Sequence, residues 1–192
     1  HQSLPAGGIE APEVVAADDG WMATIDNRST GPIMVIHDLT DLDTTWEVMN
    51  GSIEVDSPYT ISGSLMAVSN QTALSVYNLN TISISTLPMM TMDMQRVDDV
   101  ILTGTDDVKY IITKSEGELR AFDIEGNEQT LGFEAEGIEL VRANGLELAM
   151  VLEDEPTSIQ FSRIGSTGSI TIKEINASGP PEQDEILELW GT

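Results

Sequence analysis

The chain consists of short runs in which apolar and polar residues alternate, separated by clusters of Gly, Asn, Asp, Ser and Thr. Alternation with a period of two places successive side chains on opposite faces of a β-strand, whereas an amphipathic helix needs a period near 3.6. The longest apolar runs cover about five to seven residues, which is a usual strand length. Val, Ile and Thr dominate these runs, so the pattern predicts an all-β fold of short strands.

These runs align with one another in four successive copies. Each copy contains a strand that ends in a turn, and these strands recur at intervals of about 40 residues. They cover residues 32–41, 73–81, 118–127 and 158–166. Each is preceded by two further runs joined by turns, which cover 13–20 and 21–31, 59–64 and 65–72, 99–107 and 108–117, and 138–145 and 147–157. A fourth run follows in each copy, over 44–50, 82–88, 128–137 and 169–175.

Four strands in a unit of about 40 to 45 residues are typical of a propeller blade. The third copy, ITKSEGELRAFDIEGNEQTLGF, resembles the repeats of quinoprotein-type propellers, and the second, LMAVSNQTALSVYNLNT, is similar to the YVTN-type repeats of surface-layer proteins. The chain thus resembles the β-propeller superfamily over residues 12–175. It has no Trp-Asp dipeptide, and only Trp46 lies near a position of the quinoprotein docking tryptophans. Neither a WD40 domain nor a quinone cofactor is therefore expected.

The resemblance implies four four-stranded blades that stack face against face around an axis, because a single sheet cannot bury both of its faces. Small residues in the first strand of a copy, such as Ala16 and Gly104, suit the crowded centre. The four blades either close a ring or form part of a larger ring, with the missing blades from a second copy of the chain or from residues outside it. A β-sandwich or jelly roll, which also has short strands at regular spacing, is the alternative.

The repeats have an arm before them and a tail after them. Residues 1–11 contain Pro and Gly without periodicity and form an N-terminal arm. The four repeats are expected over about 12–50, 59–88, 97–137 and 138–175. Residues 176–192 form an acidic C-terminal tail, in which 182–190 suit one or two helical turns with Ile186, Leu187 and Trp190 on one side.

Charge narrows the range of partners. The chain has 33 Asp and Glu against 8 Lys and Arg, for a formal net charge of -25. Such a surface repels phosphate backbones and anionic lipid, so nucleic-acid binding is not expected. No apolar run reaches the roughly 18 to 20 residues of a membrane-spanning helix. The excess of carboxylates fits a solvated acidic surface, adaptation to high salt, or a surface that binds calcium.

The residues that usually carry catalysis are scarce. There is no cysteine, and the two histidines are His1 and His37. His37 is next to Asp38 in the sequence, but adjacent strand residues point to opposite faces and would not meet. There is no G-x-S-x-G nucleophile motif and no phosphate-binding glycine loop. We therefore expect no catalytic residue and no cofactor, with calcium as the one cofactor left open.

Carboxylates are clustered near the predicted turns, where calcium or a metal-dependent enzyme would use them. The pairs are Asp18–Asp19, Asp41–Asp43, Asp98–Asp99, Asp106–Asp107 and Glu153–Asp154–Glu155. None has the spacing of a calcium-binding EF-hand loop. Some lie at the ends of inner strands, where propeller enzymes place ligands; those residues, with one arginine, are Asp18, Asp19, Asp106, Asp107 and Arg142.

Four of the eight asparagines begin N-x-[ST] triplets, which are acceptors for glycans. They are Asn27, Asn50, Asn70 and Asn176. Asn27 and Asn70 occupy the same hairpin in successive copies, a position that suits an exposed glycan. Glycosylation would place the chain outside the cell or on a particle surface, and the alternative is the cytoplasm of a halophile.

Together these features favour a non-enzymatic binding or scaffold module whose blade loops contact a protein or a glycan. The first alternative is a metal-dependent propeller hydrolase or lyase that acts on a sugar or a lactone. The second is a structural coat or assembly subunit. The binding module and the coat subunit could each form a homo-oligomer.

Overall fold

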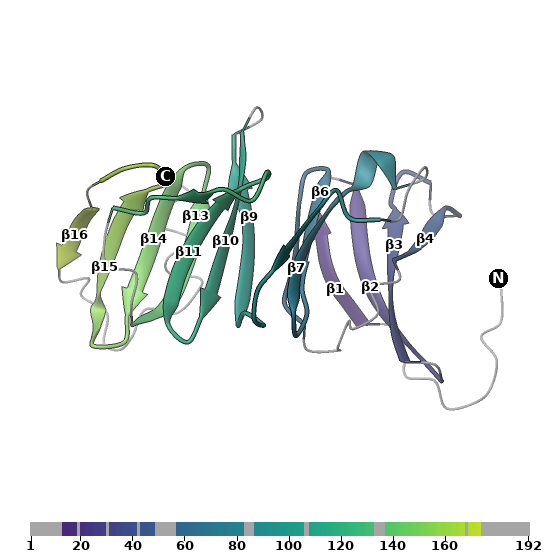
Figure 1. Cartoon of the computed structure of the whole chain (residues 1–192), viewed down its shortest axis with the longest axis horizontal. Coiled ribbons are helices and arrows are strands. Elements are labelled where there is room, and N and C mark those ends of the chain that lie inside the picture. Colours follow the sequence, from purple (N-terminus) through teal and green to yellow (C-terminus); the bar gives the residue numbers. More distant parts are fainter. Residues whose placement is uncertain are drawn as a thin grey trace.

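The computed structural model describes residues 13–18, 20–29, 31–41, 43–48, 57–82, 87–105, 108–132, 137–167 and 169–173. These residues form sixteen β-strands and one short 3-10 helix (Figure 1). The strands assemble into four antiparallel sheets, each made from four strands that are consecutive in the chain. The expectation of an all-β fold with four four-stranded blades is therefore confirmed. The β-sandwich or jelly-roll alternative is wrong, because no sheet combines strands from different repeats.

The first two sheets are named blade 1 and blade 2. Blade 1 consists of β1 (Glu13–Asp18), β2 (Trp21–Arg28), β3 (Gly31–Asp38) and β4 (Thr45–Val48). Blade 2 consists of β5 (Tyr59–Ser62), β6 (Leu65–Ser69), β7 (Ala73–Asn78) and β8 (Met90–Asp93), with the 3-10 helix η1 (Leu79–Thr81) after β7. Both sheets are meanders, so each strand pairs with the strand that precedes it in the chain.

The other two sheets, blade 3 and blade 4, repeat this order. Blade 3 consists of β9 (Asp99–Gly104), β10 (Lys109–Ser115), β11 (Glu118–Asp123) and β12 (Glu128–Gln129). Blade 4 consists of β13 (Ile138–Asn144), β14 (Glu147–Leu152), β15 (Glu155–Arg163) and β16 (Ser169–Lys173). The two-residue β12 is much shorter than the run predicted over 128–137, of which residues 133–136 lie outside the described segments.

The fourth strand of blade 2 lies later in the chain than predicted. The pattern favours a strand over 82–88, but the strand that pairs with β7 is β8, with Val76 opposite Met90. Residues 83–86 of the run predicted over 82–88 lie outside the described residues, so that run stays a prediction, whereas the edge strand that pairs with β7 is β8. Asn78 caps η1 by accepting a hydrogen bond from the backbone N–H of Asn80, and the chain turns there, at the end of the run predicted over 73–81. The alternation of Met90, Thr91, Met92 and Asp93 then provides the edge strand.

Stacking of apolar sheet faces holds the blades together. All five residues of β6 are buried: Met66 and Val68 face blade 1, whereas Leu65 and Ala67 face blade 3. Burial of one such large aliphatic side chain contributes about 1.5 to 3 kcal/mol, so a sheet with two apolar faces depends on a neighbour on each side.

Three clusters of buried residues lie between successive blades. The cluster between blades 1 and 2 includes Ile25, Ile36, Met66 and Tyr77, and the half-buried rings of Trp21 and Trp46 pack against it with centroids 5.8 Å apart. The cluster between blades 2 and 3 includes Leu74, Val76, Val100, Leu102 and Ile111. The cluster between blades 3 and 4 includes Ile112, Leu119, Val141, Leu148 and Met150. Alternation along each strand therefore sorts the residues into two faces, as the sequence predicts.

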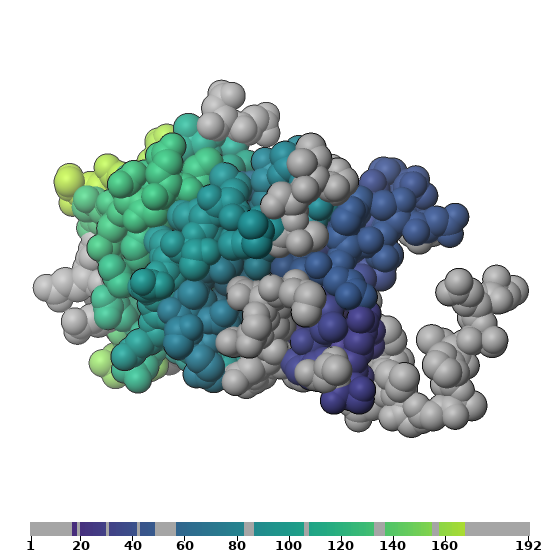
Figure 2. All heavy atoms as spheres, turned by 45° about the vertical axis from the view of Figure 1, so that its right-hand side comes forward, coloured from purple at the N-terminus to yellow at the C-terminus, as the bar shows by residue number. Residues whose placement is uncertain are grey.

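The first strands of the blades lie side by side in chain order: β1 beside β5, β5 beside β9, and β9 beside β13. Blade 1 and blade 4 lie at opposite ends of the molecule (Figure 1). Figure 2 shows the same progression on the surface, with the colours of the described residues running from purple and blue to yellow-green across one face. Of the two arrangements left open by the sequence, the described residues form an open arc and not a closed four-blade ring.

Hydrogen bonds also connect neighbouring blades. The carboxylate of Asp18, at the end of β1, accepts a hydrogen bond of 2.9 Å from the backbone N–H of Gly63 in blade 2. The hydroxyl of Thr103 in blade 3 donates a 2.8 Å hydrogen bond to the carbonyl of Gly145 in blade 4. Both contacts lie near the turn between the first two strands of a blade.

That turn contains a glycine with positive φ in every blade: Gly20, Gly63, Gly104 and Gly145, with φ of +85°, +56°, +128° and +60°. Only Gly104 is also crowded, because a Cβ there would lie 2.1 Å from the carbonyl oxygen of Val108. Close approach within its own hairpin, and not the central axis inferred from the sequence, thus explains this small residue.

We predict that Gly104→Ala lowers the free energy of unfolding by about 2 kcal/mol or more, since backbone atoms of the hairpin must shift to admit the methyl group. Gly63→Ala is the matched control. It lies in the equivalent hairpin with open space around its Cβ position, so only the cost of about 1 kcal/mol for positive φ applies. Urea denaturation of both variants measures the difference, and equal losses would contradict the role assigned to Val108.

Candidate interaction surface

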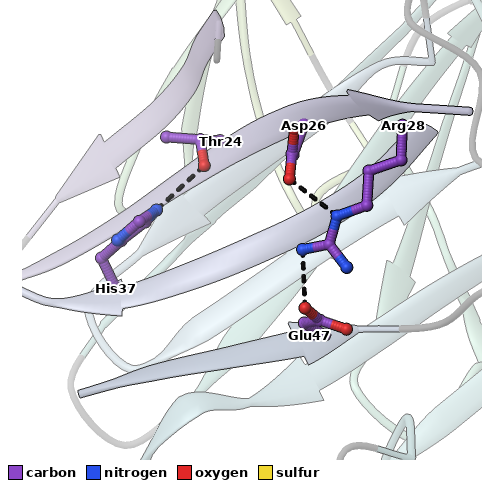
Figure 3. Close-up of polar contacts among 5 residues, drawn as sticks. All are labelled: Thr24, Asp26, Arg28, His37 and Glu47. Carbon is purple, nitrogen blue, oxygen red and sulfur yellow. Dashed lines mark hydrogen bonds and ion pairs between the residues drawn. The ribbon is translucent and has the colours of Figure 1, made fainter. Parts of the chain in front are cut away.

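The face of blade 1 that points away from blade 2 carries several polar side chains, including His37, the one histidine among the described residues. The Oγ1 atom of Thr24 on β2 and the Nε2 atom of His37 on β3 share a 2.9 Å hydrogen bond (Figure 3). Asp38 points elsewhere: its Oδ1 atom accepts hydrogen bonds of 2.8 Å and 2.6 Å from the backbone N–H and hydroxyl of Thr40. The prediction that His37 and Asp38 do not meet is therefore confirmed. Partial burial lowers the pKa of His37 from its ordinary value.

The same face carries a small ion-pair network. The guanidinium of Arg28 donates to the carboxylates of Asp26 at 2.7 Å and Glu47 at 2.6 Å (Figure 3). These two hydrogen bonds raise the pKa of Arg28, so its charge is constant at any ordinary pH. Arg28 and Glu47 are exposed and Asp26 is partly exposed, so solvent screens both pairs and they add little to stability.

A side-chain cap recurs at the end of the third strand in three of the four blades. Asp38, Asn78 and Asp123 occupy this position, and each accepts a hydrogen bond from the backbone N–H two residues later. Asx residues commonly form such turns. The signal was visible in the aligned segments HDLT, YNLN and FDIE, but our sequence interpretation did not assign these residues a role. The fourth blade has Arg163 there, and its turn is closed by the Ser166 N–H and the Arg163 carbonyl.

Asp123 makes the most hydrogen bonds among these caps. Partial burial by itself would raise the pKa of its carboxyl group. Hydrogen bonds from the Asn127 side chain and from the backbone N–H groups of Asn127, Glu125 and Gly126 outweigh it and lower the pKa. The residue therefore stays ionised and organises the turn from β11 to β12.

The clustered carboxylates serve turns in the described part of the chain. Asp41 accepts from the Thr44 hydroxyl at 2.7 Å, and Asp98 accepts from the Glu116 backbone N–H at 2.8 Å. Glu153 and Asp154 are exposed in the turn between β14 and β15, whereas Asp19, Asp106 and Asp107 lie outside the described residues. Among the described residues, no group of three His, Asp or Glu side chains has the geometry of a metal site. Calcium binding stays a prediction.

Of the residues considered for an enzyme site at the axis, the two that the structure describes, Asp18 and Arg142, are not brought together. Asp18 belongs to blade 1, and its carboxylate bonds the backbone of Gly63. Arg142 belongs to blade 4 at the other end of the arc, and its Nη1 atom donates to the carbonyl of Val141 at 2.8 Å. The two described residues therefore belong to different blades and do not form one site.

A cleft of about 630 Å³ opens between blade 2 and blade 3. Its walls come from the end of β8 with the segment that follows it, and from the β10–β11 hairpin. Val97 and Thr113 in its lining are buried, whereas the carboxylates of Asp93, Glu116 and Glu118 are exposed around it. The lining of this cleft is mainly polar, unlike the apolar lining of most small-molecule pockets, so it suits a charged, solvated segment better than an apolar ligand.

Arg120 is the one basic residue among those that line the cleft in the described part of the chain. Its guanidinium forms a two-point contact with Glu128, at 2.8 Å and 3.0 Å, and lies 5.0 Å from the centre of the Phe122 ring. The ion pair with Arg120 lowers the pKa of Glu128. The sequence did not reveal this cleft, because its walls come from two different repeats.

The four N-x-[ST] asparagines have different positions in the structure. Asn50 and Asn176 lie outside the described residues, and Asn27 is half-buried near the end of β2. Asn70 is only 5% exposed, and its Oδ1 atom accepts from the backbone N–H groups of Thr72 and Ala73 at 2.9 Å and 2.8 Å. A glycan on Asn70 would require this side chain to leave the hairpin that it caps. Glycosylation at all four positions stays a prediction.

Comparisons with solved structures identify the class of fold. The chain is similar to Hsv2p of Kluyveromyces lactis, with a TM-score of 0.56 and 11% identity, over 91% of this chain and 52% of that one. It is also similar to a chain of the Mitotic Checkpoint Complex, with a TM-score of 0.53 and 17% identity, over 92% of this chain and 62% of that one. These are β-propeller proteins, so the described arc has the β-propeller fold.

The chain spans little more than half the length of these similar structures. No family model matches the sequence, and no curated protein matches it. The finer resemblance to quinoprotein-type or YVTN-type repeats stays a prediction. Among the described residues there is no helix of the length and hydropathy that crossing a bilayer requires.

We predict that His37 makes stability depend on pH. Because folding lowers its pKa, the unfolded chain binds more protons, and the stabilisation is complete above the ordinary value of 6.5 and falls as the pH drops below it. Urea denaturation at about pH 7.5 and pH 5 should show that the difference between the native chain and His37→Gln shrinks at the lower pH. An unchanged difference would contradict this role.

We predict that Asp123→Ala lowers the free energy of unfolding by about 1 kcal/mol at neutral pH, because two backbone N–H groups lose their acceptor. Asp123→Asn keeps an acceptor oxygen and should lose less. Since folding lowers the pKa of Asp123, its stabilisation exists above the ordinary value of 3.8 and is lost as the pH falls below it. In acid denaturation, the difference between Asp123→Asn and the native chain should therefore diminish.

Proposed function

We propose that this chain is a non-enzymatic, protein-binding scaffold module and that the cleft between blades 2 and 3 receives a positively charged peptide segment of a partner. The observation that carries the proposal is the cleft itself, in which exposed Asp93, Glu116 and Glu118 surround the buried Val97. The carboxylates would pair with Lys or Arg side chains, and Val97 and Met94 would contact their aliphatic stems.

The charge of the whole chain supports this choice of partner. With a formal net charge of -25, the surface attracts cationic segments over a distance and accelerates their encounter. Arg120 opposes them locally, but its guanidinium is already bound to Glu128. Because Arg120 is positively charged, the positive groups of the bound partner should lie on the side of the cleft away from it.

The fold likeness supports a role in protein assembly. One chain of similar fold belongs to the Mitotic Checkpoint Complex and therefore occurs in a complex with other components. Similarity of fold alone leaves the partner of the present chain open. Two finer parts of the proposal have separate grounds: a location on an exported or particle surface rests on the N-x-[ST] triplets, and a glycan as a second kind of partner rests on the loops that the blades present at their two ends.

A pair of variants with opposite effects tests the cleft. Binding of a fluorescent Lys/Arg-rich peptide of about ten residues is measured by anisotropy at low and moderate salt. Glu118→Gln should weaken binding by about three- to five-fold, and Arg120→Met should strengthen it by a similar factor, because each changes the local charge by one unit.

Glu153→Gln is the matched control, since Glu153 is an exposed carboxylate in the β14–β15 turn of blade 4. It should leave the affinity unchanged. If Glu153→Gln weakens binding as much as Glu118→Gln, the peptide responds only to the net charge of the chain, and the proposed site is wrong.

A further inference from the structure

The face of blade 4 that points away from blade 3 is built like the faces between blades. Strand register places Leu140, Val151 and Ile159 opposite one another in one row across this sheet. The next row contains Ala149 and Phe161. These five apolar residues form one cluster, which is separate from the cluster between blades 3 and 4. We call it the terminal face.

The centre of the terminal face is buried. Ala149, Val151 and Ile159 are exposed by only 0%, 2% and 1%, although the described side chains in their cluster all belong to blade 4. A sheet face that met water would expose such residues. Blade 1 differs, because its own outward face carries the polar contacts of His37 and Arg28. Something in the chain other than a described blade therefore covers the terminal face.

Two arginines and one glutamate, Glu147, lie at the rim of the terminal face in an otherwise acidic chain. Arg142 lies in the same row as Ala149 and Phe161, and Arg163 lies beyond Phe161 on β15. Arg163 contacts Glu147 only at 3.9 Å, with both side chains largely exposed. Two of the eight basic residues of the chain thus flank one apolar patch, which suits an acidic, amphipathic occupant.

We propose that the occupant is the C-terminal segment 182–190 of the same chain, EQDEILELW, with Ile186, Leu187 and Trp190 against the terminal face. The segment combines these apolar residues with four carboxylates that complement the arginines. It follows β16, which is the edge strand of this sheet. Eight residues, 174–181, connect the two and can span up to about 26 Å, whereas the middle of the sheet lies about 10 Å from β16.

A second copy of the chain fits the observations less well. Residues that a second copy buried would be exposed in a single chain, but the centre of the terminal face is buried within one chain. Two copies that each carry a net charge of -25 would also repel one another. Coverage by the chain's own tail explains the burial within one chain and involves no repulsion between two copies.

Cross-linking tests the proposal directly, because the native chain contains no cysteine. Phe161→Cys is combined with Trp190→Cys in the full chain and treated with a short bis-maleimide at low protein concentration. The control pair replaces Phe161→Cys by Thr91→Cys, an exposed position on β8 of blade 2. The first pair should give several-fold more intramolecular product by mass spectrometry. Equal yields, or a product that is mainly intermolecular, would overturn the proposal.

A second measurement leaves the terminal face itself unchanged. Ile186→Asn and Glu188→Asn introduce the same residue on opposite sides of the segment, if it is helical. Binding of a dye that fluoresces on apolar surfaces should rise several-fold for Ile186→Asn and stay at the native level for Glu188→Asn. Identical dye binding by the two variants would show that the segment does not cover the terminal face.

Discussion

The need to bury both faces of every sheet governs this structure. A four-stranded meander of alternating residues has two sides, and in blades 2 and 3 both sides are apolar. Stacking in chain order satisfies this requirement, and the three clusters between blades are its direct result. The turns, the polar contacts between blades and the cleft all follow from the spacing and rotation that this stacking imposes. The two ends of the arc are the places where the requirement must be met in another way.

Blade 1 and blade 4, the two ends of the arc, satisfy this requirement in different ways. Blade 1 presents the hydrogen bond of Thr24 with His37 and the ion pairs of Arg28 on its outward face, so polar groups replace part of an apolar face there (Figure 3). Blade 4 keeps an apolar outward face whose centre is buried. This asymmetry gives the arc a direction, with a polar beginning and an apolar end that needs a cover.

Electrostatics connects the fold with the proposed role. Among the described residues, carboxylates on the sheets hold several arginines: Asp26 and Glu47 hold Arg28, Glu128 holds Arg120, and Glu147 contacts Arg163 at longer range. These pairs use only a small part of the 33 acidic residues. The surplus leaves a negative field over the surface, and the cleft between blades 2 and 3 adds a shape in which a cationic segment of a partner can be held.

The sequence by itself determined the type, number and order of the strands. Alternation, turn residues and self-similarity at about 40 residues are local signals, so they identified four sheets of four strands and most strand positions. The sequence did not place the edge strand of blade 2, which is β8 and follows the cap by Asn78 and the 3-10 turn. It also gave no role to Asp38, Asn78 and Asp123, although their common position was readable. Only the tertiary structure decided that the blades form an open arc, that Glu118 and Asp93 border one cleft, and that the outward face of blade 4 is buried. Those facts depend on which faces of distant segments meet, and a pattern along one segment carries no information about the position of another.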